Sequence, residues 1–563
     1  MGTTNAVVIG PSVLTFLAPS ADLILRGGST TALRNQAVIG YFSNGGGQMN
    51  GNVTGDLRIS CNTFDLDNSN CGTNSYVALG FATQSSGGTA TPYTINSNTI
   101  EVVANGTGIN QMGRASAVGD QAYVCLGAHV NTSAGLAGQV QIQNLRVQTG
   151  GDLLMTGSNA LPVTAFIPVT LGVLGGAGST GVLEVQNLFI NCLGLLSMQS
   201  GIQHNTNNHS RVEIFNGQSS SSSTLQMTIN AQNLNVESSQ SLLPAVGAPV
   251  DIDSRGFLTI NVTQDMTMIG QTATSTATAI NDLDVNVGRN FNASGPSTTA
   301  LANSGGAYTL DVGNDIILGD SAFMIQAFNG TSQPYTMTAG RDIISTNTST
   351  SFVIIQQGGA GFTNDMEIFA GRNIRLPLST FVRKFGPGNL NIIVDNNFPT
   401  FPGIGPGGFT LGATSSVDNF GNFISGGPVR IFTARRSQNF ITGFINGTLF
   451  TPGAAFVDTD LERWCAYYFN SFVGPNFTIF YKECDELLGE LFRSSSAPIV
   501  TVEALRNLHP YDEYLGWPLF FDFEYREMER SPVPYFKRID KHGDNTPKDK
   551  EVKTFNFSEY SSL

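Results

Sequence analysis

A short motif recurs along the chain and restricts the folds that it can form. Each copy runs from alternating polar and apolar residues into an Asn or Asp followed by an apolar residue, as in Val140–Val147, Leu183–Ile190 and Asp311–Leu318. Between residues 263 and 395 the copies lie roughly 25 to 30 residues apart, which is about the length of one coil of a parallel β-helix. Nearer the N-terminus they lie about 45 residues apart, which predicts an intervening coil that has lost the motif.

Stacking of coils explains why two positions of the motif recur, the Asn or Asp and the apolar residue after it. Each position forms a column along the stack. A single coil cannot bury its own apolar side, so it is stable only against its neighbours. Equivalent side chains then lie about 4.8 Å apart, so that Asn amides can bond to one another and aliphatic side chains fill a shared interior. Leu188, Ile316 and Ile374 are expected in that interior. The predicted fold class is all-β: a right-handed parallel β-helix with a small, partly helical C-terminal domain.

The Asn/Asp column is the predicted structural ladder. Neighbouring Asp315 and Asp342 would repel each other if both faced the interior, so we expect the column at a solvent-facing corner or bonded to backbone amides. Glycines two residues earlier, such as Gly288, Gly313 and Gly340, are expected to adopt a positive φ at the bend. The predicted ladder consists of Asn144, Asn187, Asn233, Asp265, Asn290, Asp315, Asp342, Asn373 and Asn397.

Composition excludes several classes of protein. Only 12% of residues are charged, yet 40% are hydrophobic and alternate with polar residues in runs such as Leu283–Val287, which favours half-buried strands over disorder. The net charge of -14 would repel a phosphate backbone, so nucleic acid is not an expected partner. The sequence has no run of about 18 apolar residues, so no transmembrane helix is predicted. Residues 1–10 lack the features of a signal peptide, so a removed leader, a fragment and another export route all stay open.

The domain organisation follows from a shift in composition. Charged residues are concentrated in the C-terminal part, which also contains both tryptophans, Trp464 and Trp517. Helical spacing is predicted over 458–468, 483–492 and 502–508. We expect N-terminal coils or a cap over 1–130, β-helix repeats over 131–450, a small α+β domain over 451–530 and a charged tail over 531–563.

Six cysteines leave two interpretations open. Cys61 and Cys71 are close enough in sequence to close a small loop, and Cys465 with Cys484 could join two of the predicted helices. An even count in a chain rich in Asn and Thr favours an oxidising compartment, where these two pairs are the candidate disulfides, although the sequence does not fix the pairing. Buried free thiols are the equally weighted alternative. The cysteine spacing does not match a metal site, and we predict no cofactor and no metal.

Three turns resemble a known family. Ala339-Gly-Arg-Asp-Ile343, Ala370-Gly-Arg-Asn-Ile374 and Val287-Gly-Arg-Asn-Phe291 are similar to turns of filamentous-haemagglutinin-like proteins of bacterial surfaces. The resemblance covers about residues 130 to 400 and implies a β-helix that is secreted and acts in adhesion or surface assembly. The chain departs from the family because we see no two-partner secretion domain and no C-terminal autotransporter barrel.

The polar residues of the repeat have either catalytic and binding roles or structural ones. Glycoside hydrolysis needs two carboxylates about 5 to 9 Å apart, for which Asp315 with Asp342, or Asp282 with Asp284, would be the candidates. Asn replaces Asp in most copies and cannot perform the same acid/base work, so turn residues are the favoured interpretation. His204 and His209 lack further metal ligands. Arg289, Arg341 and Arg372 would form either a basic stripe for acidic sugars or exposed corner residues.

We therefore expect an exported structural or adhesive protein of a bacterial surface, not an enzyme. It is expected to self-assemble into a rod or filament, or to form a homo-oligomer, because the open ends of a β-helix expose unpaired strand groups. A host or cell-surface protein or glycan is the expected external partner. The alternative is a carbohydrate-active β-helix enzyme, either a polysaccharide lyase or hydrolase or a tailspike-like depolymerase.

Overall fold

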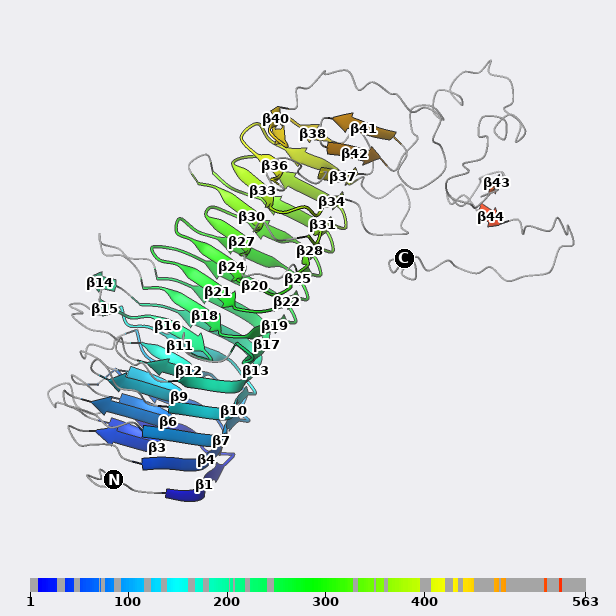
Figure 1. The fold of residues 1–563 in the computed structure, drawn as a ribbon. Helices are drawn as coiled ribbons and strands as arrows, with labels where there is room; N and C mark the ends of the chain where they lie inside the picture. The colour runs from blue at the N-terminus through cyan, green and yellow to red at the C-terminus, as the bar shows by residue number, and fades with distance from the viewer. Residues whose placement is uncertain are drawn as a thin grey trace, which may run out of the picture.

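Consecutive coils of the chain stack on one another through parallel strands (Figure 1). Each strand of a coil pairs in parallel with the equivalent strand of the coils before and after it. The predicted parallel β-helix is confirmed in this computed structural model. The structure describes residues 9–27, 36–44, 51–69, 71, 76–85, 93–115, 123–132, 139–159, 168–175, 182–201, 203–205, 208–217, 223–239, 248–327, 333–348, 351–358, 363–394, 407–420, 429–433, 439–449, 470–474, 477–481, 521–523 and 536–538.

The strands line up in three faces of the β-helix. Two faces belong to one 26-stranded sheet and the third is the core of a 14-stranded sheet. The first face contains β1 (Ile9–Ala18), β4 (Gly51–Cys61), β7 (Tyr93–Ala104), β10 (Gln139–Thr149), β13 (Leu183–Gln199), β17 (Gln226–Glu237), β19 (Phe257–Val262), β22 (Leu283–Val287), β25 (Tyr308–Val312), β28 (Tyr335–Ala339), β31 (Met366–Ala370), β34 (Leu390–Val394), β37 (Val429–Thr433) and β42 (Phe477–Tyr481).

The second face begins where the first ends, and the long strands β13 and β17 continue across the corner into it. It contains β2 (Leu23–Arg26), β5 (Phe64–Asp67), β8 (Asn110–Met112), β11 (Leu153–Thr156), β20 (Met266–Ile269), β23 (Phe291–Ser294), β26 (Ile316–Leu318), β29 (Asp342–Ser345), β32 (Asn373–Leu376), β35 (Phe409–Leu411) and β38 (Phe440–Ile441).

The third face closes each coil. It contains β3 (Gln36–Asn44), β6 (Tyr76–Ser85), β9 (Tyr123–Thr132), β12 (Val169–Gly175), β16 (Val212–Phe215), β18 (Val250–Ser254), β21 (Ser275–Ala279), β24 (Thr299–Asn303), β27 (Ala322–Gln326), β30 (Val353–Gln357), β33 (Thr380–Lys384), β36 (Ser416–Asn419) and β39 (Phe444–Ile445). Four antiparallel pairings complete the described strands: β40 (Thr448–Leu449) on β39, β41 (Asn470–Gly474) on β42, β14 (Gln203–Asn205) on β15 (Asn208–His209), and β43 (Phe521–Phe523) on β44 (Phe536–Arg538).

Coil length changes along the stack. In the middle of the chain, bonded neighbours such as Asp265 and Asn290 are 25 residues apart, as the repeat predicts. Nearer the N-terminus, Asn144 bonds directly to Asn187, which is 43 residues later. The predicted intervening coil therefore does not exist: the early coils are longer, with strands such as the twelve-residue β7.

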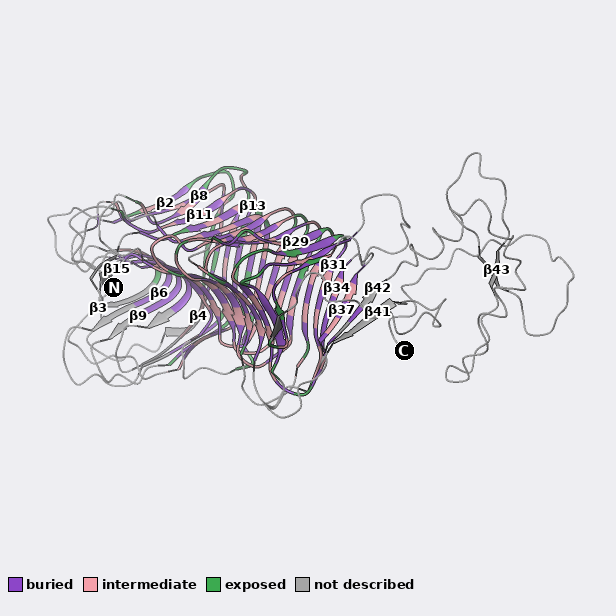
Figure 2. Ribbon diagram, turned by 90° about the horizontal axis from the view of Figure 1, so that it is seen from above, coloured by how far each residue is buried: buried purple, intermediate pink, exposed green. Residues whose placement is uncertain are grey.

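One main apolar core runs through the stacked coils. Along strands such as β22 and β28 every second residue is buried, which appears in Figure 2 as alternating purple and pink bands. Leu188, Ile316 and Ile374 belong to this core and are 1%, 0% and 1% exposed, as predicted. Burying aliphatic side chains from every coil contributes roughly 1.5 to 3 kcal/mol each, so the core is what holds successive coils together.

The prediction that the corner glycines adopt a positive φ is wrong. Positive φ angles occur at other glycines, among them Gly127 (123°) and Gly172 (116°) in the third face, whereas Gly288 and Gly313 do not have them. A Cβ added at Gly288 would lie 2.2 Å from the carbonyl oxygen of Thr263 in the preceding coil. The corner glycines are therefore needed for close approach of successive backbones.

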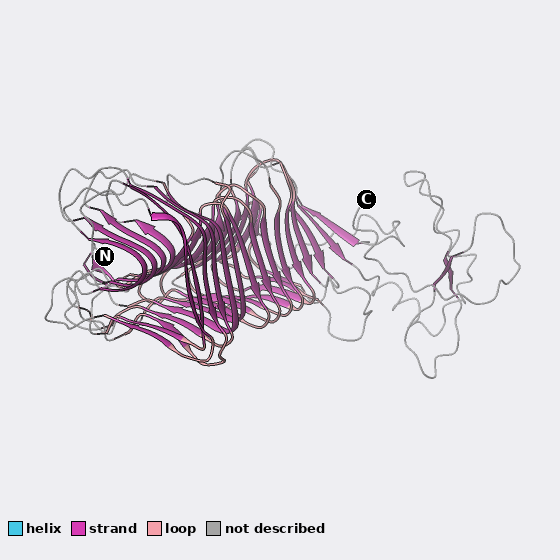
Figure 3. Ribbon diagram, turned by 90° about the horizontal axis from the view of Figure 1, so that it is seen from below, coloured by secondary structure: helices cyan, strands magenta, loops and turns pink. Residues whose placement is uncertain are grey.

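Strands extend beyond the predicted boundary at residue 450. β42 pairs in parallel with β37 and so continues the first face, and β41 covers β42 in antiparallel register. The three predicted C-terminal helices lie outside the described residues, which contain only strands and loops (Figure 3). No helix in the described part of the chain is long and apolar enough to cross a bilayer.

Candidate functional site

Six of the predicted ladder residues lie on successive coils at the corner between the first and second faces. The apolar residues that follow them are in register from β17 to β32, for example Met266 with Phe291 and Ile316 with Ile343. We call this column the corner ladder. It consists of Asn233, Asp265, Asn290, Asp315, Asp342 and Asn373.

Each carboxylate of the corner ladder accepts hydrogen bonds from the next coil. The Oδ1 atom of Asp265 accepts from the backbone N of Asn290 at 3.2 Å and from its Nδ2 at 3.0 Å. Oδ1 of Asp342 accepts from the backbone N and Nδ2 of Asn373 at 3.1 and 3.0 Å. The carboxylates thus satisfy backbone donors at the corner, where the chain passes from the first face to the second.

Three arginines neutralise the acidic members of the corner ladder. Nε of Arg372 donates to Oδ1 of Asp342 at 2.9 Å, and its Nη2 binds the second oxygen, so the contact is bidentate. Arg289 binds Asp265 in the same way. Burial alone would raise the pKa of Asp342, but hydrogen bonds from Arg372 and Asn373 outweigh it and hold the pKa below its usual value.

The arginines are therefore already paired. Arg341, like the other two, is about half exposed and binds the carboxylate of the preceding coil, in its case that of Asp315. A free basic stripe for acidic sugars does not form. The same contacts occupy Asp315 and Asp342, the first catalytic pair considered. Of the second pair, Asp282 accepts a hydrogen bond from the backbone N of Ala307 at 2.8 Å.

Asn144 and Asn187 belong to a separate ladder on the first face. Nδ2 of Asn187 donates to Oδ1 of Asn144 at 3.2 Å, but Asn187 is in register with Gln226 and not with Asn233. The single predicted column is therefore wrong at this point, because β17 carries the alternating pattern on both faces and the sequence similarity does not separate them. Asn397 lies outside the described residues, and Gly408 donates its backbone N to Oδ1 of Asn373.

The described cysteines are free and buried, which corrects one predicted disulfide. Cys61 ends β4 and is 0% exposed, and the Sγ atom of Cys71 packs against the backbone of Gly27, where a Cβ would come within 1.9 Å of it. Burial raises the pKa of the Cys61 thiol to about 11 and that of Cys71 to about 12. These thiols fill the core as small apolar groups. Cys465 and Cys484 lie outside the described residues.

Metal binding finds no support among the described residues. His204 is in β14 and His209 is in the antiparallel strand β15. Within the described part of the chain, no group of three or more His, Cys, Asp or Glu side chains is placed to hold a metal ion.

An acidic group that the sequence did not reveal lies on the third face. Glu213 on β16 is in register with Asp251 on β18, and Arg211 contacts both, at 2.6 Å from Oε1 of Glu213 and 3.5 Å from Oδ2 of Asp251. Burial raises the pKa of Glu213 to about 7, with Arg211 opposing and the nearby acids Asp251 and Asp253 reinforcing the rise. The three acids follow no repeated motif, so no sequence signal could have grouped them.

A polar column runs inside the β-helix at the end of the third face. Asn303, Gln326, Gln357 and Lys384 are in register on consecutive coils and are at most 2% exposed. The amide Nδ2 of Asn303 donates to the carbonyl oxygens of Gly306 and Ala307, and Nζ of Lys384 donates to that of Phe385 at 3.3 Å. These side chains bind loop carbonyls that would otherwise be buried without donors.

Replacing Lys384 by Gln, the residue of the two preceding coils, is expected to stabilise the fold at pH 7. Burial lowers the pKa of Lys384 to about 8, from 10.5, so the folded state holds its proton less tightly than the unfolded state. Below pH 8 this difference lowers the free energy of unfolding by about 3 kcal/mol. The loss disappears as the pH rises toward 10.5. Urea unfolding at pH 7 and pH 10 should show this rise for the natural chain and not for Lys384→Gln. An equal rise in both proteins would contradict the assignment.

A cavity of about 500 Å³ lies on the third face near its last described coils. Its lining includes Phe381 from β33, Ser416 and Asp418 from β36, Phe444 from β39, and Phe420. The cavity has no sequence signal, because its residues come from three coils that do not share the motif.

Comparison with protein-family models, curated proteins and solved structures found no match to this chain. The resemblance to filamentous-haemagglutinin-like proteins therefore stays a prediction based on three turns.

Proposed function

We propose that this chain is a structural or adhesive protein of a bacterial surface whose stiff β-helix presents its outer faces to a partner. The observation that carries the proposal is the corner ladder, in which carboxylates, arginines and backbone amides bond coil to coil from Asn233 to Asn373. A bonded column along the axis opposes bending, because tilting one coil would break contacts with the next.

The same contacts favour this proposal over the carbohydrate-active alternative. Asp315 and Asp342 each bind an arginine through both oxygens, so neither is available as a general acid or nucleophile. Such a rod would span roughly 60 Å over the 14-stranded sheet, at about 4.8 Å per coil. Export and a surface location are part of the proposal and follow from the resemblance stated above.

Assembly of the rod is expected to depend on β41 and β42. Deleting residues 451–563 removes the strand that pairs with β37 and leaves its edge groups unpaired, which favours association between copies. We expect light scattering to give a mass larger than that of the full chain. The matched control is deletion of 482–563, which keeps β41 and β42. It should leave the number of chains in each particle the same as for the full chain.

Two results would count against this proposal. An unchanged assembly state after deletion of 451–563 would show that the edge of β37 does not drive association. Electron micrographs of the full chain that show round particles without an elongated axis would contradict the rod itself.

A further inference from the structure

The cavity on the third face has an unusual wall construction. Phe381, Ser416 and Phe444 are in register on three consecutive coils, so the small serine lies between two phenylalanines. The backbones of Phe381 and Phe444 are therefore two coil spacings apart, roughly 10 Å. Because Ser416 does not fill the space between them, the two aromatic side chains form opposite walls of a slot. We call these three residues the phenylalanine slot.

The floor beside the slot is polar and fixed in position. Ser416 donates its hydroxyl to Oδ2 of Asp418 at 2.6 Å, and the backbone N of Gly447 donates to Oδ1 at 3.2 Å. Asn446, which precedes Gly447, has a φ of 47°, an uncommon conformation for a residue with a Cβ. An ionised carboxylate accepts about four hydrogen bonds, so Asp418 keeps acceptor capacity for a ligand.

The charge around the slot is balanced. Arg383 is in register with Asp418 on the preceding coil, and its guanidinium lies 4.7 Å from the centre of the Phe381 ring. The guanidinium of Arg383 therefore interacts with the face of the Phe381 ring and offsets the negative charge of Asp418. An ammonium ligand would meet that cation, and a phosphate or carboxylate ligand would meet Asp418. The arrangement favours a neutral ligand that has apolar faces and hydroxyl donors.

We propose that the phenylalanine slot binds a neutral sugar ring of a glycan. The C–H groups of the sugar ring lie against Phe444 and against the side of Phe381 that Arg383 leaves uncovered, and a ring hydroxyl donates to Asp418. This gives the proposed adhesive function a class of ligand and rests on that function for its biological role. Binding itself does not depend on how the rods assemble.

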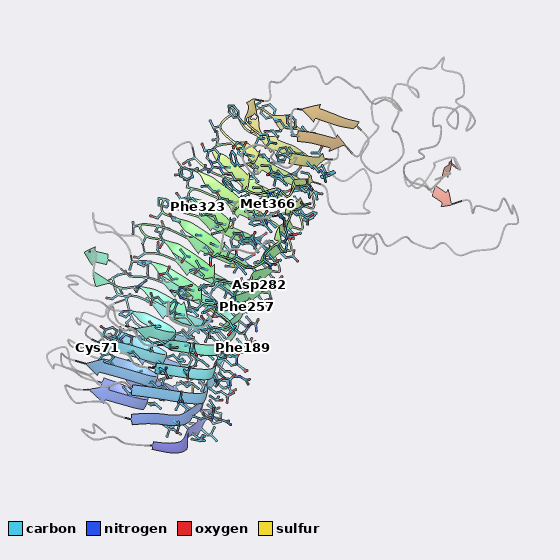
Figure 4. The ribbon with its side chains drawn as sticks, viewed as in Figure 1. Cys71, Phe189, Phe257, Asp282, Phe323 and Met366 are labelled. Carbon is cyan, nitrogen blue, oxygen red and sulfur yellow. The ribbon has the colours of Figure 1, made fainter. Side chains whose placement is uncertain are left out.

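Further aromatic side chains continue from the slot toward earlier coils. Phe352 is 47% exposed and lies edge-on to Phe381, with ring centres 6.3 Å apart, and Phe323 is 6.0 Å from Phe352. Figure 4 labels Phe323 on the side of the β-helix formed by β27, far from Phe189 on β13. A glycan longer than one sugar unit would meet these rings when it runs along the axis.

The test uses the full chain and saturation-transfer NMR with the methyl glycosides of glucose, galactose, mannose and N-acetylglucosamine, and with tetramethylammonium as a cationic probe. We expect at least one glycoside to bind at millimolar concentration. Ser416→Phe fills the slot and Phe444→Ala removes one wall, and each should weaken binding about tenfold. Phe189→Ala, which removes an aromatic ring that is 36% exposed on another face, should leave binding unchanged.

Thermal unfolding of each variant shows whether it folds, and Phe444→Ala keeps the test valid if Ser416→Phe does not. The proposal is overturned if no glycoside binds, if binding survives both slot variants, or if only tetramethylammonium binds and is lost in the variants. The light-scattering result for the truncated chain is independent of each of these outcomes, so a failed slot leaves the rod proposal standing.

Discussion

Between pH 6.5 and pH 3 the chain is expected to lose about 5 kcal/mol of stability through a single buried side chain, His129. It is 1% exposed, its ring centre is 4.2 Å from that of Tyr123, and its Nε2 atom has no hydrogen-bond partner among the described residues. Burial therefore lowers the pKa of His129 to about 3, from 6.5. The unfolded chain binds a proton in this pH range and the folded chain does not, so acid favours unfolding.

The matched variant is His129→Leu, because Leu174 occupies the same register position in the next coil. The free energy of unfolding of both proteins is measured with urea at several pH values between 7 and 3. Plotted against pH, the two curves should differ in slope only below pH 6.5. Acidic residues titrate in both proteins, so the difference between the curves isolates His129. Parallel curves would mean that the imidazole is protonated in the folded state or is exposed before the coils unfold.

His129 lies in a part of the fold where the alternation of polar and apolar residues could not predict which residues are buried. Tyr76 and Tyr123 are stacked with ring centres 4.9 Å apart, and with Cys125 they belong to a small second cluster of buried residues separate from the main core. In β6 and β9 residues on both sides of the strand are buried. Alternation predicts one buried side, so a strand that is covered on both sides gives no signal of which residues face outward.

The main core, by contrast, follows directly from the repeat. An apolar residue after each Asn or Asp, once per coil, predicts a shared interior, and Ile316 and Ile343 are in register there. The sequence also predicts that the column before them bonds to backbone amides. Coil length could not be predicted in the early part, because the long strands β13 and β17 carry the same alternation on two faces, so the motif can be aligned to either face.

The candidate sites depend on side chains from different coils, and this explains why the sequence did not reveal them. Ser416 matters only because Phe381 and Phe444 lie above and below it, 35 and 28 positions away in a part where coil length varies. Glu213 and Asp251 are likewise neighbours through register alone. The motif fixes the spacing of the coils only where it recurs, so residues between its copies cannot be aligned across coils.

Replacing Asp342 by Leu is expected to lower the free energy of unfolding by about 3 kcal/mol, because the change leaves both its partners without an acceptor. Asp342 is 4% exposed and binds the Arg372 guanidinium together with the backbone N and Nδ2 of Asn373. Arg372 is half exposed and can turn to water, whereas the backbone N of Asn373 is buried and cannot. Most of the loss should therefore come from the orphaned backbone donor.

Asp342→Asn is the matched control, since Asn already occupies this column at positions 290 and 373. It keeps an oxygen for the backbone N of Asn373 but loses the charge and the second acceptor oxygen, which binds the half-exposed Arg372. We therefore expect a loss of about 1 kcal/mol. The hydrogen bonds hold the pKa of Asp342 below its usual value, so the stability that the carboxylate contributes is present above the unfolded pKa of 3.8 and is lost as the pH falls. The gap between the natural chain and Asp342→Leu should consequently narrow in acid. Equal losses for Asp342→Leu and Asp342→Asn at pH 7 would mean that the ion pair with Arg372, and not the hydrogen bond to the backbone N of Asn373, carries the energy of the corner ladder.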